Sequence, residues 1–283
     1  MKVLVTGVKG QLGYDVCKVL AQRGIEHIGT DLVDFDITDQ TATHRFIREY
    51  GPDAVIHCSA WTAVDAAEDV PEKAAAVNVE GPRNIARVCS EIGAKMVYIS
   101  TDYVFPGEGE TFYEVDDQTG PQSVYGKTKL GGELAVKDLL DRYFIVRISW
   151  VFGKNGNNFV RTMLRLAETR SELGVVCDQI GSPTYTADLA PLLCDMIESE
   201  NYGIYHATNE GLCSWAEFAE EIFRLAEKSV KVNYILSKDY PAKAKRPLNS
   251  RLSKQCLEDG GFKRLPHWKD ALARYLQELK EEF

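Results

Sequence analysis

The sequence predicts an α/β protein built on a doubly wound parallel sheet, with a second, smaller lobe. Short β-branched runs alternate with helical patterns through the first half of the chain. The runs over 95–101 and 144–149 are continuous apolar strands, as expected when crossover helices bury both faces of a parallel sheet. After Trp150 this alternation loosens into glycine, asparagine and proline-containing loops. The 283 residues, 45% of them hydrophobic, are enough to bury a full core.

Each element of the sheet layer follows from a local pattern. β-branched and aromatic runs predict strands, and apolar residues spaced three and four apart predict the helices between them. We expect strands over 2–6, 27–30, 54–59, 95–101 and 144–149, and helices over 12–23 and 41–50 and along one long stretch that ends near Val88.

The second lobe is expected to take most of residues 151–283, discontinuously, while residues 1–150 form most of the first domain and later segments return to it. Amphipathic patterns predict helices over 159–170, 215–226 and 267–282. Ser214 stands three residues before Glu217, the spacing of a capping box, which favours a structural role for this serine over a nucleophilic one.

A glycine-rich segment follows the first strand. Gly7 allows a tight turn, Gly10 allows the backbone to approach a pyrophosphate, and Gly13 lets the next helix pack against the strand. Gln11 and Leu12 open that helix, whose N-terminus offers free N–H groups to phosphates. The segment predicts a Rossmann-type site for NADPH or NADH.

An acidic residue ends the second strand. Asp31 can accept hydrogen bonds from the adenosine ribose and would repel a 2′-phosphate, which favours NADH unless a side chain such as Lys9 offsets the charge. Asp36 and Ile37 are expected near the adenine, although an aspartate in a turn is commonly a cap.

Three residues carry the predicted chemistry. Tyr125 and Lys129 stand one helical turn apart on one face, so the ammonium is expected to lower the pKa of the phenol and make Tyr125 a general acid. Thr101, at the end of the fourth strand, is expected to hydrogen-bond the same substrate oxygen. Together with a nicotinamide hydride, this set would reduce a ketone.

These segments resemble the dTDP-4-dehydrorhamnose reductases of the extended short-chain dehydrogenase/reductase superfamily along essentially the whole chain. The resemblance is carried by Gly10-Gln11-Leu12-Gly13, Ala60-Trp61-Thr62-Ala63-Val64-Asp65, Ser100-Thr101-Asp102-Tyr103, Tyr125-Gly126-Lys127-Thr128-Lys129, Arg147-Ile148-Ser149-Trp150 and Arg246-Pro247-Leu248-Asn249-Ser250. Trp61 stands where the family often has tyrosine, and Cys58-Ser59 replace its usual small pair.

The resemblance implies NAD(P)H-dependent reduction at C4 of dTDP-4-dehydro-L-rhamnose to dTDP-L-rhamnose. Asp102, Tyr103 and Trp150 would contact the sugar, with core packing as the alternative for Trp150. Ser59, Ala60 and Trp61 are expected beside the dinucleotide. Arg246 is a candidate for the substrate diphosphate, against an alternative of plain surface charge.

Composition narrows the remaining function classes. A net charge of −9 argues against a nucleic-acid partner, and no apolar run is long enough for a membrane span, so we expect a cytoplasmic protein. The seven cysteines are scattered, as in a reduced protein, and the five histidines show no ligand spacing, so no metal is expected. A homodimer is left open.

Three rival functions stay open at this point. A related epimerase or 4,6-dehydratase would share the motifs, but the dehydratase typically has Asp-Glu where this chain has Asp102-Tyr103. A reductase of another nucleotide-linked keto sugar is the second. The third is a non-catalytic regulatory subunit of methionine adenosyltransferase type, because fold and motif can persist without activity.

Overall fold

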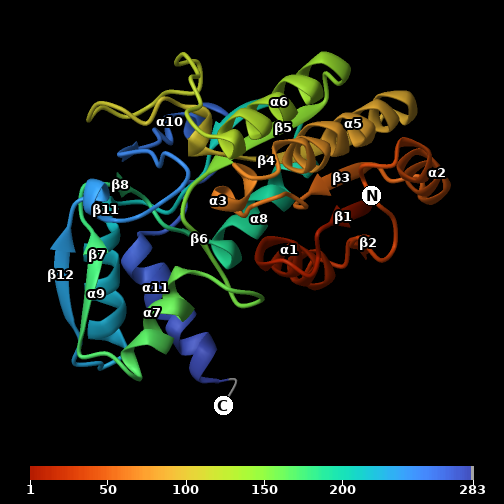
Figure 1. The fold of residues 1–283 in the computed structure, drawn as a ribbon. Coiled ribbons are helices and arrows are strands. Elements are labelled where there is room, and N and C mark those ends of the chain that lie inside the picture. Colours follow the sequence, from red (N-terminus) through yellow and green to blue (C-terminus); the bar gives the residue numbers. More distant parts are fainter. Residues whose placement is uncertain (282–283) are drawn as a thin grey trace.

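A six-stranded parallel sheet forms the centre of the molecule in the computed structural model, which describes residues 1–281 (Figure 1). Its order is β10-β5-β4-β3-β1-β2. The strands are β1 (Lys2–Thr6), β2 (Glu26–Thr30), β3 (Ala54–His57), β4 (Lys95–Thr101), β5 (Tyr143–Ile148) and β10 (Gly203–His206). The predicted doubly wound parallel sheet is confirmed.

Helices cover both faces of this sheet (Figure 1). On one side lie α1 (Gln11–Gln22) and α8 (Thr186–Glu198), and on the other α2 (Gln40–Tyr50), α5 (Gly81–Ile92) and α6 (Val124–Leu139). Successive residues of β1 show why: Val3 and Val5 pack into the cluster with α1 and α8, whereas Leu4 packs with α2, α5 and α6. A strand buried on both faces must be apolar at every position.

The order of the strands fixes where a ligand can bind. The chain passes from β1 to β2 on one side and then crosses to β3, β4 and β5 on the other, so the topology switches between β1 and β3. In open α/β sheets the crevice at the carboxyl ends of the strands at this point is the usual ligand site. Thr6 and His57 are paired there.

The predicted long helix ending near Val88 is wrong. The structure instead has α3 (Val64–Ala67), α4 (Pro71–Ala75), a π-helical turn η1 (Ala76–Glu80) and then α5. Pro82 explains the π turn, because a proline has no N–H for the carbonyl four residues earlier and clashes with it. That carbonyl, of Asn78, accepts the Tyr98 hydroxyl at 3.4 Å.

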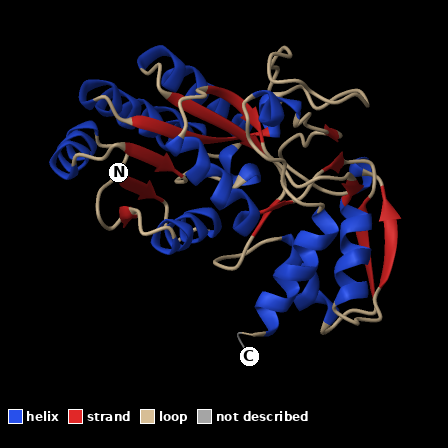
Figure 2. Ribbon diagram, turned by 180° about the vertical axis from the view of Figure 1, so that it is seen from behind, coloured by secondary structure: helices blue, strands red, loops and turns tan. Residues whose placement is uncertain are grey.

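A separate helical layer lies to one side of the sheet (Figures 1 and 2). It contains α7 (Phe159–Ala167), α9 (Trp215–Leu225) and α11 (Trp268–Lys280), beside the parallel pair β7 (Glu172–Val176) and β12 (Lys231–Ile235). Its core is distinct and rich in aromatic residues, including Phe152, Phe218, Trp268 and Tyr275. α8 and β10, both after residue 150, belong instead to the sheet layer.

Short strands join the two layers. β6 (Val151–Phe152) pairs with β9 (Thr184–Tyr185), and β8 (Ile180–Gly181) pairs with both β11 (Cys213–Ser214) and β13 (Asn249–Ser250). The predicted capping box of Ser214 and Glu217 is confirmed at the start of α9. Helix α11 begins after His267, and the last residue predicted for it, at position 282, lies outside the described residues. Across 1–281, no helix has both the length and the apolar character that crossing a bilayer requires.

Candidate active site

A pocket of about 780 Å³ opens at the carboxyl ends of β1, β3 and β4, where the topology switches. Most of the residues that the sequence singled out line this one pocket, although they come from widely separated segments. They are Gly7, Gly10, Gln11, Leu12, Gly13, Asp31, Asp36, Ile37, Ser59, Ala60, Thr101, Asp102, Tyr103, Tyr125, Lys129 and Trp150. Trp61 and Arg246 are not among the lining residues.

The glycine segment has the geometry that a dinucleotide needs. A Cβ at Gly7 would lie 2.8 Å from the backbone nitrogen of Ser59, and one at Gly13 would lie 2.4 Å from the carbonyl oxygen of Gly7. Gly7 also has a φ of 72°, which favours glycine. Gly10 is the N-cap of α1 and offers no side-chain cap, so the first N–H groups of α1 stay free for a diphosphate.

Asp31 follows β2, on the other side of β1 from Thr101, which ends β4. Its carboxylate accepts the backbone N–H groups of Lys9 at 3.1 Å and Leu32 at 2.9 Å. These bonds fix the carboxylate at the end of β2, beside the glycine segment. A contact between Asp31 and the adenosine ribose stays a prediction.

Asp36 lines the pocket but has a clear structural task. Its Oδ1 accepts both the N–H and the hydroxyl of Thr38, at 2.9 and 2.8 Å, which is the turn-capping alternative. Ile37 beside it is buried, and its carbonyl accepts the Asn84 amide. An adenine contact for either residue stays a prediction.

Helix α6 places Tyr125 in the pocket. Ser123 caps the helix by accepting the N–H of Gly126 at 3.1 Å. A Cβ at Gly126 would lie 2.3 Å from the carbonyl of Tyr103, so glycine allows α6 to approach the residues that follow β4. Tyr125 then meets the Tyr103 ring edge to face at 5.3 Å. Tyr125 and Thr101 both line the pocket.

Lys129 is held by groups other than Tyr125. Its Nζ donates to the carbonyl of Ile99 at 2.7 Å and lies 4.1 Å from the centre of the Tyr98 ring. Burial lowers the pKa of Lys129 to about 7, opposed by the nearby Glu133 carboxylate.

The expected lowering of the Tyr125 pKa by Lys129 is wrong for this structure. Burial raises the pKa of Tyr125 well above its usual value of 10, and Asp102 and Tyr103 add to the rise. The Thr101 hydroxyl opposes this rise. Tyr125 therefore keeps its proton at neutral pH, so it has a proton to donate but is a weaker acid than a phenol in water.

Asp102 begins a short 3₁₀ helix, η2 (Asp102–Val104), and is 3% exposed. Its two carboxylate oxygens accept the hydroxyls of Thr101, at 3.0 Å, and Ser250. Burial raises the pKa of Asp102 to about 6, against the effect of these two hydrogen bonds.

Two tryptophans form one wall of the pocket. Trp150 and Trp215 stack with their ring centres 3.8 Å apart, and both rings stay partly exposed. Trp150 has a φ of 51°, a left-handed conformation that costs free energy in a bulky residue. The indole N–H of Trp215 donates to Gln179 at 3.1 Å, which fixes the orientation of its ring. Trp150 both lines the pocket and packs on the aromatic core, so the two interpretations of it are compatible.

Arg246 and Trp61 lie beside the pocket. The guanidinium of Arg246 pairs with Asp65 at 2.7 Å and donates to the Tyr103 hydroxyl at 3.2 Å, so it contacts one lining residue. The backbone of Trp61 exchanges hydrogen bonds with the Asn78 amide, and its indole N–H donates to the carbonyl of Ala63. Direct ligand contacts for both residues stay predictions.

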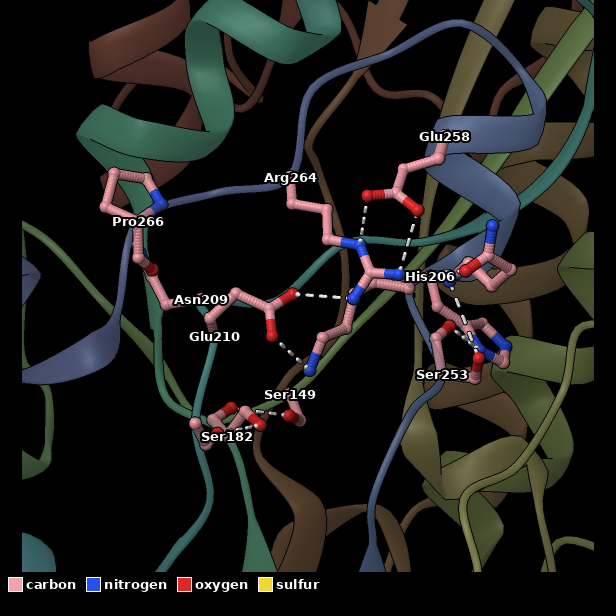
Figure 3. A network of polar contacts seen from close by, with 12 residues as sticks. Ser149, Ser182, His206, Asn209, Glu210, Ser253, Glu258, Arg264 and Pro266 are labelled. Atoms are coloured by element: carbon pink, nitrogen blue, oxygen red, sulfur yellow. Dashed lines mark hydrogen bonds and ion pairs between the residues drawn. The ribbon is translucent and has the colours of Figure 1, made fainter.

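Figure 3 shows a second polar network, in which Ser149 lines this pocket whereas Glu210, Ser253 and Arg264 line a separate hollow. Arg264 pairs there with Glu258 at 3.1 Å and with Glu210 at 3.6 Å. The described residues contain no group of three or more side chains suited to hold a metal, and the seven cysteines are free thiols.

Comparison with known proteins shows the family to which this chain belongs. The sequence model of the family described as the RmlD substrate binding domain matches residues 1–281. This chain belongs to that family. It is 44% identical over 277 residues to the spore coat polysaccharide biosynthesis protein SpsK of Bacillus subtilis, covering 98% of this chain and 97% of that protein.

Solved structures of the RmlD substrate binding domain family show the same fold. A dTDP-4-dehydrorhamnose reductase from Clostridium acetobutylicum is 45% identical, with a TM-score of 0.97 over 99% of this chain and 100% of its own. The Bacillus anthracis dTDP-4-dehydrorhamnose reductase, solved in complex with NADP, is 42% identical, with a TM-score of 0.95 over 98% and 99% of the two chains.

Sequence reasoning missed two parts of this family's pocket. Trp215 was noted only as the start of a helix, although it stacks on Trp150. The loop at Asn155, Gly156 and Asn157 also lines the pocket, and the Asn155 amide donates to the carbonyl of Lys9 at 3.0 Å. A run of glycine and asparagine directly after a strand was the available signal for this loop.

Proposed function

We propose that this protein reduces the C4 ketone of dTDP-4-dehydro-L-rhamnose to dTDP-L-rhamnose, with NADPH or NADH as reductant. One observation carries the proposal: Thr101, Tyr125 and Lys129 line the same pocket as the glycine segment. Relatives named for this reaction, 42% and 45% identical with TM-scores of 0.95 and 0.97, support the choice of substrate.

The glycine segment fits a dinucleotide diphosphate for two reasons. Gly7 and Gly13 have no Cβ where neighbouring backbone atoms lie close, and no side chain caps the first N–H groups of α1. When bound, the reduced dinucleotide supplies the hydride that adds to C4 of the sugar. Tyr125 donates a proton to the C4 oxygen, and Thr101 hydrogen-bonds that oxygen as negative charge develops on it. Lys129, which lines the same pocket, would hold the nicotinamide ribose beside them.

The substrate side is proposed from the other wall of the pocket. Tyr103, Trp150 and Trp215 offer two stacking surfaces and a hydroxyl, which suit a nucleotide-linked sugar. Trp215 comes from the lobe that we assign to sugar binding, which takes most of residues 151–283, and Tyr103 and Trp150 complete the wall from the first 150 residues. Position 103 carries no carboxylate, which disfavours dehydration of the hexose.

The proposal is tested by following oxidation of NADH and of NADPH with dTDP-4-dehydro-L-rhamnose generated in place. Wild type should turn over, and Tyr125→Phe should lose about 10²- to 10⁴-fold in kcat while its dissociation constant for the dinucleotide stays within about threefold. Tyr103→Phe is the matched control, since it loses a neighbouring hydroxyl that is not the proton donor, and it should change KM more than kcat.

Two outcomes would contradict this function. Turnover with another nucleotide-linked keto sugar, and none with dTDP-4-dehydro-L-rhamnose, would show that the proposed substrate is wrong. The similarity to SpsK is a reason to include other keto sugars in the assay. A folded, dinucleotide-binding protein that turns over no keto sugar and captures a methionine adenosyltransferase in stoichiometric amount would favour the regulatory subunit. Light scattering on the same sample measures the molar mass in solution and so tests whether the protein is a homodimer.

A further inference from the structure

A buried glutamine lies behind the tryptophan wall of the pocket. Gln179 is 6% exposed and is not among the residues that line the pocket. Its Oε1 accepts the indole N–H of Trp215 at 3.1 Å, and its Nε2 donates to the hydroxyl of Ser237 at 2.9 Å. Because an indole can only donate, the amide oxygen must face Trp215, and the amide nitrogen is then left for Ser237. Both ends of the Gln179 amide are used, so its orientation is fixed.

An aspartate anchors this glutamine from behind. The Ser237 hydroxyl donates to Oδ1 of Asp178 at 2.6 Å, and the Ser237 N–H donates to the same oxygen at 2.9 Å. Ser237 begins η3 (Ser237–Asp239), whereas Asp178 and Gln179 lie between β7 and β8. The Ser237 hydroxyl has one proton, which goes to Asp178, so its lone pairs are free for the Gln179 amide. A line of hydrogen bonds therefore runs from Asp178 to the ring of Trp215.

Trp150 is held by packing instead. Its ring stacks on Trp215 with 14° between the two planes, and its indole N–H makes no hydrogen bond among residues 1–281. A Cβ at Gly181 would lie 3.1 Å from two atoms of the Trp150 ring, so glycine leaves room for that ring. The left-handed backbone of Trp150 persists only where the surroundings hold it. The position of the Trp150 ring therefore depends on Trp215 and Gly181.

We propose that Gln179 is a positioning residue for the nucleotide sugar, which holds the Trp215 ring and through it the Trp150 ring. The proposal rests on the reduction proposed above. One stretch, residues 178–181, serves both rings: Gln179 holds Trp215, and Gly181 leaves room for Trp150. Without the Gln179 oxygen the Trp215 ring can turn about its side-chain bonds, and the stacked Trp150 ring loses its support. The wall then meets the substrate in several arrangements instead of one, which weakens binding.

Gln179→Met tests this role, because methionine keeps the length of the side chain but offers the indole N–H only a weak acceptor. We expect KM for the keto sugar to rise about tenfold while kcat stays within about threefold, since the wall binds substrate and transition state alike. KM for the dinucleotide should stay within about twofold, because the hydrogen bonds of the Gln179 side chain lead to Ser237 and Trp215 and not to the glycine segment. An unchanged KM for the keto sugar would overturn the proposal.

Trp215→Phe shows whether Gln179 acts through the indole. Phenylalanine keeps an aromatic ring beside Trp150 but has no N–H, so Gln179 has no ring to hold in this background. Trp215→Phe alone should raise KM for the keto sugar, and adding Gln179→Met should change it by less than about twofold. A further tenfold rise in the double variant would mean that Gln179 acts by another route, which contradicts the proposal.

Tyr185→Phe is the matched control. Tyr185 is 3% exposed, and its hydroxyl donates to Glu278 at 2.7 Å in the aromatic core on which both tryptophans of the wall pack. Like Gln179→Met, this variant removes a buried hydrogen bond, but Tyr185 does not line the pocket. Both variants should lower Tm, and only Gln179→Met should raise KM for the keto sugar. An equal rise in KM in both would trace the effect to lost stability and count against positioning.

A readout without turnover keeps this proposal separate from the proposed function. The chain has four tryptophans, so protein labelled with 5-fluorotryptophan gives a ¹⁹F resonance for each, and Trp150→Phe and Trp215→Phe identify the two of the wall. In Gln179→Met we expect these two resonances to shift or broaden, while those of Trp61 and Trp268 stay in place. That result supports the positioning role even if the keto sugar tested is the wrong one. Wall resonances that coincide with those of wild type would rule it out.

Discussion

Glu133 and Arg147 face each other as a buried ion pair, with 2.8 Å between Oε2 and Nη2 and side chains that are 2% and 3% exposed. The Arg147 Nε donates to the other oxygen of Glu133 at 2.9 Å, so the contact is bidentate. Ser100 donates to the same carboxylate, and Arg147 also donates to the carbonyl of Val115. The pair ties β5 to α6 directly beneath the pocket.

Removing one partner of this pair should destabilise the fold strongly. Arg147→Met leaves the Glu133 carboxylate buried without its partner, and we expect a loss of about 3–5 kcal/mol in the free energy of unfolding. The double variant Glu133→Leu, Arg147→Met buries no charge and should lose clearly less than Arg147→Met alone. Urea unfolding measures both, and a double variant that is less stable than the single one would contradict this account.

Two buried histidines should make the protein sensitive to acid. His57 bonds Thr6 through Nδ1 at 2.7 Å, His206 bonds the carbonyl of Ser253 at 3.1 Å, and neither Nε2 has a hydrogen-bond partner among residues 1–281. Burial lowers the pKa of each to about 3 from an ordinary value of 6.5, with nearby Lys129 and Arg147 adding to the effect.

The sign follows from proton uptake. Between pH 6.5 and 3 the unfolded chain binds protons at these positions and the folded chain does not, so the free energy of unfolding falls as pH falls. From pH 6.5 to 5 we expect about 1–2 kcal/mol of this loss from each histidine. His57→Gln and His206→Gln should reduce the slope, whereas His44→Gln, at an exposed position, should leave it unchanged. Equal slopes in all four proteins would remove these histidines from the acid response.

The sheet could be predicted from sequence because most of its strands are short, largely apolar runs, and that pattern depends only on local residues. The break in the helix between residues 64 and 92 was missed because apolar spacing continues across it, while Pro71 and Pro82 interrupt its hydrogen bonds. The stacking of Trp150 on Trp215 depends on how two distant segments pack, which periodicity does not encode.

The pKa values of Tyr125 and Lys129 could not be predicted from the sequence, for a different reason. Their spacing correctly placed both in one pocket, but proximity alone suggested that the ammonium would lower the pKa of the phenol. The structure has Lys129 bonded to Ile99 and over the Tyr98 ring, and burial dominates both pKa values. Desolvation depends on the whole surroundings of a group and cannot be read from residue spacing.

Asp31 should set the preference between the two dinucleotides. Its carboxylate, held by the backbone N–H groups of Lys9 and Leu32, would repel a 2′-phosphate. Asp31→Ser should therefore raise the ratio of kcat/KM for NADPH to that for NADH by about tenfold or more. Asp34→Ser, which removes a nearby carboxylate that does not line the pocket, is the control. A ratio that is the same in wild type and Asp31→Ser would exclude Asp31 from the ribose site.

Arg246 should act on the nucleotide sugar and not on the dinucleotide. Its guanidinium lies between Asp65 and the hydroxyl of Tyr103, so it can position Tyr103 and remains a candidate for the substrate diphosphate. Arg246→Ala should raise KM for the sugar nucleotide about tenfold, which is about 1.4 kcal/mol, and leave KM for the dinucleotide within about twofold.

Arg264→Ala is the matched control for this prediction. Arg264 is also partly exposed and paired with carboxylates, but it belongs to the network of Figure 3 and not to the pocket. Both Michaelis constants should stay close to wild type in this variant. If Arg246→Ala behaves in the same way, its charge serves only to pair with Asp65, and the substrate diphosphate must be held by other residues.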